Sequence, residues 1–424
     1  MHGYIGVTAN ELDVIDTPVF QRLHNIKQLG MAYTVFPGAT HTRFAHSLGV
    51  MQTIDKLVTS RGLRDHIPPS ERKDLRMAAL LHDVGHYPLS HVIEVVMTDH
   101  GKYEDGRHEA NSAKVITKHL AQELNKNGFD PKELSQKILG KSEETLHNQL
   151  LASELDADRM DYLLRDAQNT GVRYGTHDID RLVHSMRLDK EGRLAVYDKG
   201  MHAAEDYMIA RYHMYGSVYS HKVVMGFAEL VQHAYEILMK SGKVYSLKSL
   251  GTLDSNQLSS FDDNYLFSKL RSSQDRHLSD IVRMIMKREP LEVAFEANMM
   301  MQRGKASQLF YQVDLLKNTD QLSKVAKQSR VPRKWIFHSS TRTQLSRLQL
   351  PPPFDVGKAK SKEMTEAIHI VDDSGRSRPL VSETRSLAYY FKQLSLGTVR
   401  IYTSQKYSDR LKKLLSEKYS KFRK

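Results

Sequence analysis

A histidine and an aspartate, side by side after an apolar run, are the feature that most limits how this chain can fold. In the stretch LLHDVGHYPLSH, His82 and Asp83 directly follow the apolar residues from Ala78 to Leu81. Burying an aspartate beside a histidine is costly unless both groups are paired or bind a cation. The doublet therefore favours a metal site inside the fold over two ordinary core side chains.

Two further residues supply ligand atoms of the same kind. His46 lies in HTRFAHSLGV and Asp158 in ELDADRMDYLLRDA, and each stretch is typical of a helix or a helix end. Imidazole and carboxylate atoms hold divalent metals, and a metal so held makes hydroxide at neutral pH. On a helix, His82 and His86 would share one face, which predicts a cluster of imidazoles around a pocket.

Composition narrows the kind of site and its partners. The 424 residues include no cysteine, so a metal must be bound by nitrogen and oxygen ligands. No apolar run approaches the roughly 20 residues that cross a bilayer, and MHGYIGVTANELDV lacks the pattern of a signal peptide, so we expect no membrane partner and a cytoplasmic protein. The net charge of +12 favours a polyanionic partner, either nucleotide phosphates or nucleic acid.

The pattern along the chain predicts a mainly α protein in two parts. Apolar residues recur at helical spacing from Glu11 to about Lys240, which predicts an all-helical domain with the metal site over residues 1–245. Residues 246–424 are expected to form a smaller α+β lobe, because short alternating stretches follow: LEVAFEAN, FYQVDLL, KWIFHS, EAIHIVDD, with a hairpin turn at DDSG, and TVRIYTS. A segment rich in proline and lysine near residues 351–362 predicts an exposed, mobile loop.

Several longer motifs resemble those of one enzyme family. They are HGYI, IDTPVFQRLHNIKQLGMAYTVFPGATHTRFAHSLGV, LLHDVGHYPLSH, LDADRMDYLLRDA and YSHKVV, and they span roughly residues 2 to 230. The chain is similar to the HD-domain metal phosphohydrolases, and among them to the deoxynucleoside triphosphate (dNTP) triphosphohydrolases. The resemblance implies an all-helical HD-domain core with one divalent ion, whether manganese, magnesium, iron or zinc. It further implies attack of water on the α-phosphorus of a dNTP, releasing the deoxynucleoside and inorganic tripolyphosphate.

Carried over by motif position, the resemblance implies a role for each residue of a site. The metal ligands are His46, His82, Asp83 and Asp158. The catalytic group is His91, as the acid for the leaving 5′ oxygen, supported by His86, His108 and Glu109. The substrate contacts are Arg43, Arg159, Arg211 and Lys222 for phosphates, Gln28, Leu29 and Asp166 for the sugar, Tyr162 and Tyr219 as aromatic walls, and Tyr215 in place of a histidine.

Helical spacing separates two acidic residues of one stretch. Asp158, Tyr162 and Asp166 follow at intervals of four and share a face, whereas Asp161 and Arg165 would form an ion pair on another face. Asp161 is therefore expected to be an ion-pair residue and not a metal ligand.

The resemblance also implies a homo-oligomer, dimer or tetramer, and an activating nucleotide at a subunit interface. Asp16 and Gln21 match residues that read guanine in a mammalian member of the family, but His24 stands where that member has an arginine, and the basic segment that precedes the motif there is missing here. Three explanations stay open: constitutive activity, activation by another nucleotide, or a true start upstream of Met1.

Two alternative functions also fit the sequence. A metal phosphodiesterase or nuclease acting on nucleic-acid ends or other nucleotides would suit the basic balance and the lysine-rich loop. A nucleotide or nucleic-acid binding module would use the metal only structurally. The set that reads the sugar distinguishes the triphosphohydrolase, since a general HD-domain phosphatase does not need it.

Overall fold

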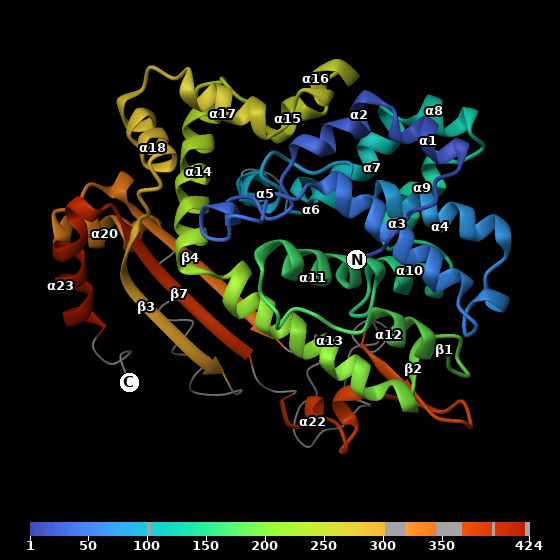
Figure 1. Cartoon of the computed structure of the whole chain (residues 1–424). Helices are drawn as coiled ribbons and strands as arrows, with labels where there is room; N and C mark the ends of the chain where they lie inside the picture. The colour runs from blue at the N-terminus through green and yellow to red at the C-terminus, as the bar shows by residue number, and fades with distance from the viewer. Residues whose placement is uncertain (100–102, 302–318, 345–366, 392–394, 420–424) are drawn as a thin grey trace.

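A helical body with two small sheets makes up the computed structural model, which describes residues 1–99, 103–301, 319–344, 367–391 and 395–419 (Figure 1). The helices of the body are α1 (Ala9–Ile15), α2 (Pro18–Gln21), α3 (Arg43–Thr59), α4 (Pro69–Leu81), α5 (His91–Asp99), α6 (Tyr103–Gly106), α7 (His108–Lys118), α8 (Ala121–Lys126), α9 (Pro131–Ile138), α10 (Thr145–Ala152), α11 (Ala157–Thr170), α12 (Ile179–Ser185), α13 (Met201–Met214) and α14 (Lys222–Lys240). The helices that follow are α15 (Leu247–Leu250), α16 (Ser255–Ser259), α17 (Asp263–Arg271), α18 (Arg276–Met286), α20 (Thr319–Ser329), α22 (Leu387–Phe391) and α23 (Ser408–Lys418). The predicted mainly α fold with a smaller C-terminal α+β region is confirmed.

Local signals fix the ends of the two helices that carry most of the site. Thr42 caps α3 by accepting a hydrogen bond from the backbone of Ala45, which places Arg43 and His46 in the first turn of that helix. Asp156 caps α11 in the same way through the amide of Arg159. Gly171 directly follows the last residue of this helix and caps its C-terminus, where its φ of 79° suits a glycine.

One sheet lies in the C-terminal part of the chain. It consists of β3 (Glu292–Met301), β7 (Ser395–Thr403) and β4 (Ile336–Gln344), in the order β3-β7-β4, with antiparallel pairing throughout. The stretches LEVAFEAN, KWIFHS and TVRIYTS lie on these strands, as their alternation predicted. FYQVDLL and the proline-rich loop near residues 351–362 lie outside the described residues.

The second sheet joins distant parts of the chain. Its strands are β1 (Met186–Leu188), β2 (Leu194–Tyr197), β5 (His369–Val371) and β6 (Ser377–Pro379), in the order β1-β2-β5-β6. β5 and β6 form the hairpin predicted at DDSG. The expectation that the region from Glu11 to Lys240 contains helices alone is wrong at β1 and β2, which are too short to show an alternating pattern and pair with β5 from far along the chain. A domain boundary near residue 245 stays a prediction.

The buried apolar residues form several separate clusters, and the polar groups of the candidate site lie between them. One cluster joins α5, α14 and α18 to the β3-β7-β4 sheet, and α14 runs between that sheet and the helical body in Figure 1. A second surrounds α3, α11, α13 and the β1-β2-β5-β6 sheet, and a third lies among α1, α2, α4, α7 and α9. Of the candidate metal ligands, His46 and Asp158 lie on α3 and α11, and His82 and Asp83 directly follow α4; these helices border the second and third clusters.

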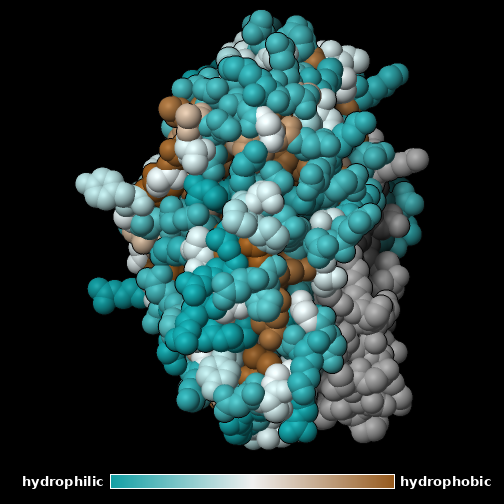
Figure 2. All heavy atoms as spheres, turned by 90° about the vertical axis from the view of Figure 1, so that its right-hand side faces the viewer, coloured by the Kyte–Doolittle hydropathy of each residue, from teal (hydrophilic) through white to brown (hydrophobic). Residues whose placement is uncertain are grey.

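One face of the molecule is mostly hydrophilic. On the face shown in Figure 2, hydrophobic residues form a narrow strip in the lower half and smaller spots toward the upper left. Among the helices described, none is long and apolar enough to cross a membrane.

Candidate active site

The four predicted metal ligands converge in the structure. His46 projects from the first turn of α3, His82 and Asp83 follow the end of α4, and Asp158 lies in the first turn of α11. His46 Nε2 is 2.9 Å from Asp158 Oδ1 and 3.6 Å from Asp83 Oδ2. His82 Nε2 is 3.3 Å from Asp83 Oδ1 and 3.7 Å from Asp158 Oδ1. Two imidazole nitrogens and two carboxylates therefore face one point.

The chemistry of this group fits a divalent metal. His82 Nδ1 donates a 2.7 Å hydrogen bond to the carbonyl oxygen of Ala79, which leaves Nε2 with a lone pair directed at the carboxylates. That nitrogen is buried and forms no well-aligned hydrogen bond with any described residue. His46, His82 and Asp83 each offer a ligand atom within 4.8 Å of the others. Nitrogen and carboxylate ligands accept manganese, iron, zinc or magnesium, so they do not select one of these metals.

Charges around the ligands are strongly coupled. Burial alone would raise the pKa of Asp83, but Arg43, whose Nη1 lies 2.5 Å from Asp83 Oδ2, and two histidines hold that pKa well below its usual range. Burial alone would lower the pKa of His46, yet hydrogen bonds to Asp158 and Asp161 raise it to about 9. Binding of a metal at His46 Nε2 would therefore release a proton.

His82 and His86 do not share a helix face, so that prediction is wrong. Helix α4 ends at Leu81, and a turn follows, because Gly85 packs against the backbone of α7. Gly85 donates a 2.9 Å hydrogen bond to Ser112 Oγ and accepts one of 2.5 Å from Asn111 Nδ2. A tertiary contact therefore ends the helix where the local pattern would continue it.

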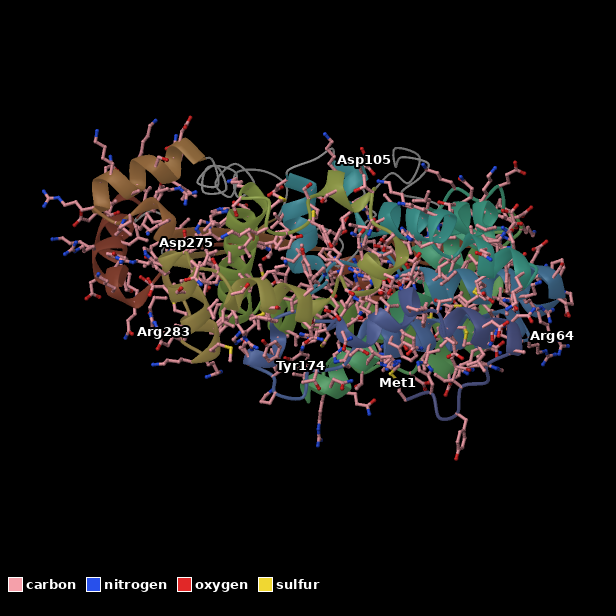
Figure 3. The ribbon with its side chains drawn as sticks, turned by 90° about the horizontal axis from the view of Figure 1, so that it is seen from above. Met1, Arg64, Asp105, Tyr174, Asp275 and Arg283 are labelled. Atoms are coloured by element: carbon pink, nitrogen blue, oxygen red, sulfur yellow. The ribbon has the colours of Figure 1, made fainter. Side chains whose placement is uncertain are left out.

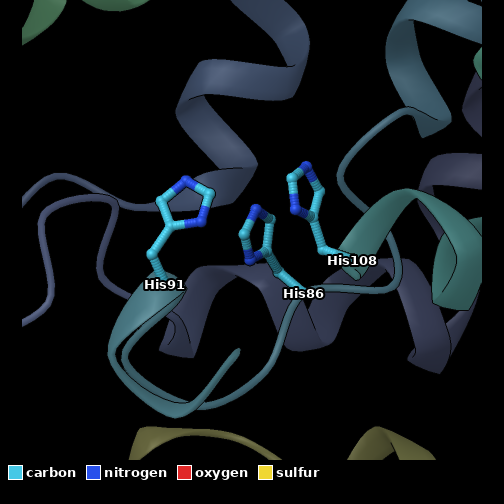
Figure 4. A group of neighbouring side chains, drawn as sticks. All are labelled: His86, His91 and His108. Carbon is cyan, nitrogen blue, oxygen red and sulfur yellow. The ribbon is translucent and has the colours of Figure 1, made fainter. Parts of the chain in front are cut away.

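Figure 4 shows a cluster of three histidines, and it lies beside the candidate metal ligands, since His86 Nε2 is 3.4 Å and His108 Nε2 is 3.8 Å from Asp83 Oδ1. His86 lies between the other two, and its ring stacks on that of His108 with centroids 4.1 Å apart and planes 14° apart. The ring of His91 meets that of His86 edge-on, at 84°. Burial, together with Arg43 and His108, lowers the pKa of His86 well below its ordinary value. Since the in-plane lone pairs of parallel stacked rings do not meet at one point, this arrangement suits proton transfer better than a second metal.

Glu94 organises this cluster, and sequence reasoning missed it. Its carboxylate accepts hydrogen bonds from His91 Nδ1 and, at 2.8 Å, from both His108 Nδ1 and the His108 amide. Burial would lower the pKa of His108, but Glu94 raises it. The predicted supporting residue, Glu109, is 3.4 Å from His108 Nδ1 and forms an ion pair with Arg107. The spacing of three between His91 and Glu94 in HVIE was the available signal.

Asp161 also takes part in the site, contrary to the expectation that it serves only an ion pair. The predicted pairing with Arg165 is present, at 2.8 Å and 3.0 Å. The same buried carboxylate accepts 2.8 Å and 2.6 Å hydrogen bonds from His46 Nδ1 and His2 Nε2. Spacing within α11 could not reveal this, because both new donors come from other segments.

A cavity of about 1650 Å³ adjoins the ligands. The predicted site residues among its lining are Gln28, Leu29, Arg43, His82, Asp83, His91, His108, Glu109, Asp158, Arg159, Tyr162, Asp166, Tyr215 and Tyr219. His46 and His86 are fully buried in the wall behind them. Arg211 and Lys222 are not among the described residues that line it. Arg211 lies behind Tyr215, with its guanidinium 5.8 Å from that ring centroid, and Lys222 is exposed at the start of α14.

The side of the cavity predicted to hold the sugar is a hydrogen-bonded wall. Asp166 accepts a 2.7 Å bond from the Tyr219 hydroxyl and a 2.8 Å bond from His41 Nε2, a residue that sequence reasoning also missed. Tyr219 ends a π-helical turn, Tyr215–Tyr219, which continues α13 into the cavity wall. The side-chain oxygen of Gln28 is buried and meets no hydrogen-bond donor among the described residues. A ligand hydroxyl could supply that donor.

Arg159 lines the cavity but is engaged within the protein. Its guanidinium donates to the carbonyl oxygen of Ser153 at 2.6 Å and pairs with Asp156. A contact with substrate phosphates would require it to share or exchange these bonds, so its substrate role stays a prediction.

The residues predicted to read an activator lie on the outer side of this region. Asp16 and His24 are exposed, His24 stacks on Phe44 at 3.6 Å, and Gln21 Nε2 donates to the carbonyl oxygen of Ile15. Between them, Arg22 is buried and donates to the carbonyl oxygens of Val84 and His86 at 2.6 Å and 3.0 Å. The role of the exposed residues as an activator site stays a prediction.

Fold and site together define the class of this protein. The family model for the HD domain matches residues 43–166, which include all four candidate ligands, and the model for the HD associated region matches residues 177–338. The uncharacterized protein YwfO of Bacillus subtilis is 35% identical over 316 residues, 70% of this chain and 71% of that protein. The chain belongs to the HD-domain phosphohydrolase family.

Particular relatives carry more specific names. The chain is similar to the deoxynucleoside triphosphate triphosphohydrolase SAMHD1 of Homo sapiens, with 30% identity over 66% of this chain and 51% of that enzyme. It therefore spans about half the length of the human relative. A hypothetical protein from Aquifex aeolicus shares the fold over 97% of both chains, with a TM-score of 0.73 and 27% identity. A phosphohydrolase from Bacteroides thetaiotaomicron has a TM-score of 0.70 over 95% of this chain and 97% of its own, and at 23% identity it bears on the fold alone.

Proposed function

We propose that this protein hydrolyses dNTPs to deoxynucleosides and inorganic tripolyphosphate. The observation that carries the proposal is the convergence of His46, His82, Asp83 and Asp158 at a cavity that is also lined by the hydrogen-bonded pair Asp166 and Tyr219. A metal site alone would suit many phosphate esters. The named triphosphohydrolases among the relatives support the narrower substrate class.

The four ligands would hold one divalent ion, which when bound lowers the pKa of a water and polarises a phosphate oxygen. Arg43 donates to Ser90 Oγ and Asp83 and lines the cavity, so its positive charge is fixed beside the place where the α-phosphate would lie. A fixed cation there stabilises the charge that develops on phosphate oxygens in the transition state.

The leaving group needs a proton, and we assign its delivery to His91. Its side chain is 63% exposed at the cavity, while its Nδ1 is held by Glu94, so Nε2 is the nitrogen open to a substrate. The attacking water would lose a proton to solvent as its oxygen bonds to the α-phosphorus, the bond from phosphorus to the 5′ oxygen would break, and the 5′ oxygen would take a proton from His91, which solvent then replaces. His108 and Glu94 hold His91 in position.

We assign selection of deoxyribose to the side of the cavity lined by Asp166 and Tyr219. Asp166 or the Gln28 amide oxygen would accept the one hydrogen of the 3′-hydroxyl, and Leu29, with the rings of Tyr162 and Tyr219, would leave no room for a 2′-hydroxyl. A site built to bond one hydroxyl and exclude another discriminates through both contacts.

Product analysis tests this proposal. Protein loaded with Mn²⁺ is incubated with each dNTP and each ribonucleotide, with and without a second nucleotide as activator, and the products are separated by chromatography. Deoxynucleoside with tripolyphosphate is the expected result. Monophosphate or diphosphate products would contradict the proposal.

The second candidate function is that of a metal phosphodiesterase, and the large extent of the cavity supports it. The lining continues from the ligands along α7, α9 and α10, where it includes Lys114, Gln136, Lys141 and Asn148. At about 1650 Å³ the cavity exceeds the roughly 300–1,000 Å³ of ordinary ligand pockets, so a longer substrate would fit. Shortening of end-labelled DNA by the same protein would establish this alternative.

Assembly and activation are part of the proposal. A homo-oligomer, dimer or tetramer, would bring Asp16, Gln21 and His24 to a subunit interface, where a nucleotide could bind. Light scattering with and without added nucleotides tests the oligomeric state and its dependence on a nucleotide. A monomer under every condition would contradict both the proposed assembly and the proposed activation.

A further inference from the structure

We propose that His2 is a positioning residue for the metal centre: it holds Asp161, and Asp161 in turn orients the ligand His46. This inference rests on the metal site of the proposed function, but not on the identity of the substrate. It joins three segments that are far apart in the sequence.

The hydrogen bonds form a continuous chain. His2 Nε2 donates to Asp161 Oδ1 at 2.6 Å, and His46 Nδ1 donates to Asp161 Oδ2 at 2.8 Å. On the far side of its ring, His46 Nε2 faces Asp158 and Asp83. A carboxylate on Nδ1 fixes the tautomer and the ring orientation that present Nε2 to a metal.

The placement of His2 differs from that of its neighbours. Met1 is about half exposed and Tyr4 is fully exposed, whereas the His2 side chain is only 4% exposed. In Figure 1 the N-terminus is drawn close to α11, the helix that carries Asp161, and Figure 3 shows Met1 against the body of the molecule. A polar ring buried from an otherwise exposed segment requires a compensating bond, and Asp161 supplies it.

Asp161 is enclosed in a way that makes its orientation sensitive to His2. Arg165 bonds to both oxygens, at 2.8 Å for Oδ2 and 3.0 Å for Oδ1. Gly49, one turn after His46 on α3, leaves the necessary space, since a Cβ there would overlap the carboxylate of Asp161. Without His2, Asp161 Oδ1 would lose one hydrogen bond and keep the bond from Arg165. The carboxylate would then be free to turn toward Arg165, which would move Oδ2 away from His46.

Loss of such outer contacts weakens metal binding on the order of tenfold or more. We expect His2→Ala to weaken binding of Mn²⁺ alone, measured by calorimetry without any nucleotide, on the order of tenfold. His2→Gln restores a donor at a similar reach and should regain most of the affinity, and millimolar imidazole should partly rescue His2→Ala. The control is Tyr4→Ala, which alters an exposed side chain of the same segment and should bind Mn²⁺ as the natural protein does.

A double-mutant cycle distinguishes an effect of His2 through Asp161 from a general effect on folding. If His2 acts through Asp161, the loss in Mn²⁺ affinity for His2→Ala with Asp161→Asn together should equal that for Asp161→Asn alone. The inference would be overturned if the losses in Mn²⁺ affinity were additive in the double variant. It would also be overturned if His2→Ala bound Mn²⁺ as the natural protein does, or if His2→Ala and Tyr4→Ala lost the same affinity. The proposed function and this inference can fail separately. If the protein binds Mn²⁺ tightly in a way that depends on His2 but does not hydrolyse dNTPs, the proposed function is wrong and this inference holds.

Discussion

Asp263 Oδ1 accepts a 2.6 Å hydrogen bond from the backbone amide of Leu89, a residue held at a φ of 54°. The next residue, Ser90, has a φ of 57°, and His91 begins α5 directly after it. Two consecutive left-handed residues that are not glycine store strain, which the surroundings must offset. Asp263 therefore braces, from α17, the loop that carries the proposed acid.

This brace predicts a pH-dependent stability. Burial raises the pKa of Asp263 to about 6, above the value near 3.9 of an unfolded aspartate. The folded state then binds more protons than the unfolded state between these values, so stability falls as pH rises from about 4 to about 6. The Asp263→Asn variant keeps an acceptor and does not ionise.

The difference in unfolding free energy, natural protein minus Asp263→Asn, should therefore drop by about 2 kcal/mol across that range, measured by urea unfolding at each pH. The prediction fails if the two curves run parallel.

Glu94 should matter more for turnover than Glu109. With Glu94→Gln, His91 and His108 lose the charge that positions them, and kcat should fall about 100-fold, the lower end of what general acid catalysis contributes. Mn²⁺ affinity should stay close to that of the natural protein, because Glu94 touches none of the four ligands. Glu109→Gln is the matched control, since Glu109 pairs with Arg107. A larger loss in the control would refute this assignment.

Gly49→Ala should destabilise the protein by roughly 1–3 kcal/mol, the usual range for overpacking. The new methyl group would overlap Asp161 and the end of Arg165. Gly226→Ala provides the comparison inside another helix, α14, where the nearest atom would be at an ordinary 3.5 Å. That change should be neutral or raise stability by up to about 1 kcal/mol, as for glycine to alanine in a helix. Thermal melts of both variants check the difference, and equal melting temperatures would count against it.

His41 should influence sugar selection through Asp166. The His41→Ala change removes the ring that donates a 2.8 Å hydrogen bond to the buried Oδ1 of Asp166. Leaving that acceptor without a donor costs about 1–3 kcal/mol of folding free energy. We expect KM for a dNTP to rise about tenfold and its preference over the ribonucleotide to shrink. His66→Ala, which changes an exposed histidine, is the control. An unchanged ratio of kcat/KM for the two sugars would remove His41 from the site.

Metal removal should reverse a measurable stabilisation. Free Mn²⁺ at 100 times its Kd adds about 2.7 kcal/mol to the unfolding free energy. Melts with Mn²⁺ and after chelation measure this gain, which Asp83→Asn should abolish because Asp83 faces both His46 and His82. A gain that survives in Asp83→Asn would show that the metal binds elsewhere.

Local patterns predicted a large share of the fold, and the family resemblance supplied most residues of the candidate site. Periodicity and turn residues predicted helices around His46 and Asp158, the β5-β6 hairpin and three strands of the C-terminal sheet. The position of His86 does not, because Gly85 packs on α7 and ends α4 early. Neither does β1 with β2, because three or four residues carry too weak an alternation to be recognised without the partner strand.

By itself, the sequence determined which residue types could bind a metal, that His46 and Asp158 lie in or at the end of helices, and the family to which the chain belongs. Those properties depend on neighbours within a few positions or on motifs in order. The tertiary structure alone decided that Glu94 holds the histidines more closely than Glu109 and that His2 reaches Asp161, 159 positions away. Such contacts have no local signature, since the hydrogen bond forms only after packing has brought distant segments together and excluded water from between them.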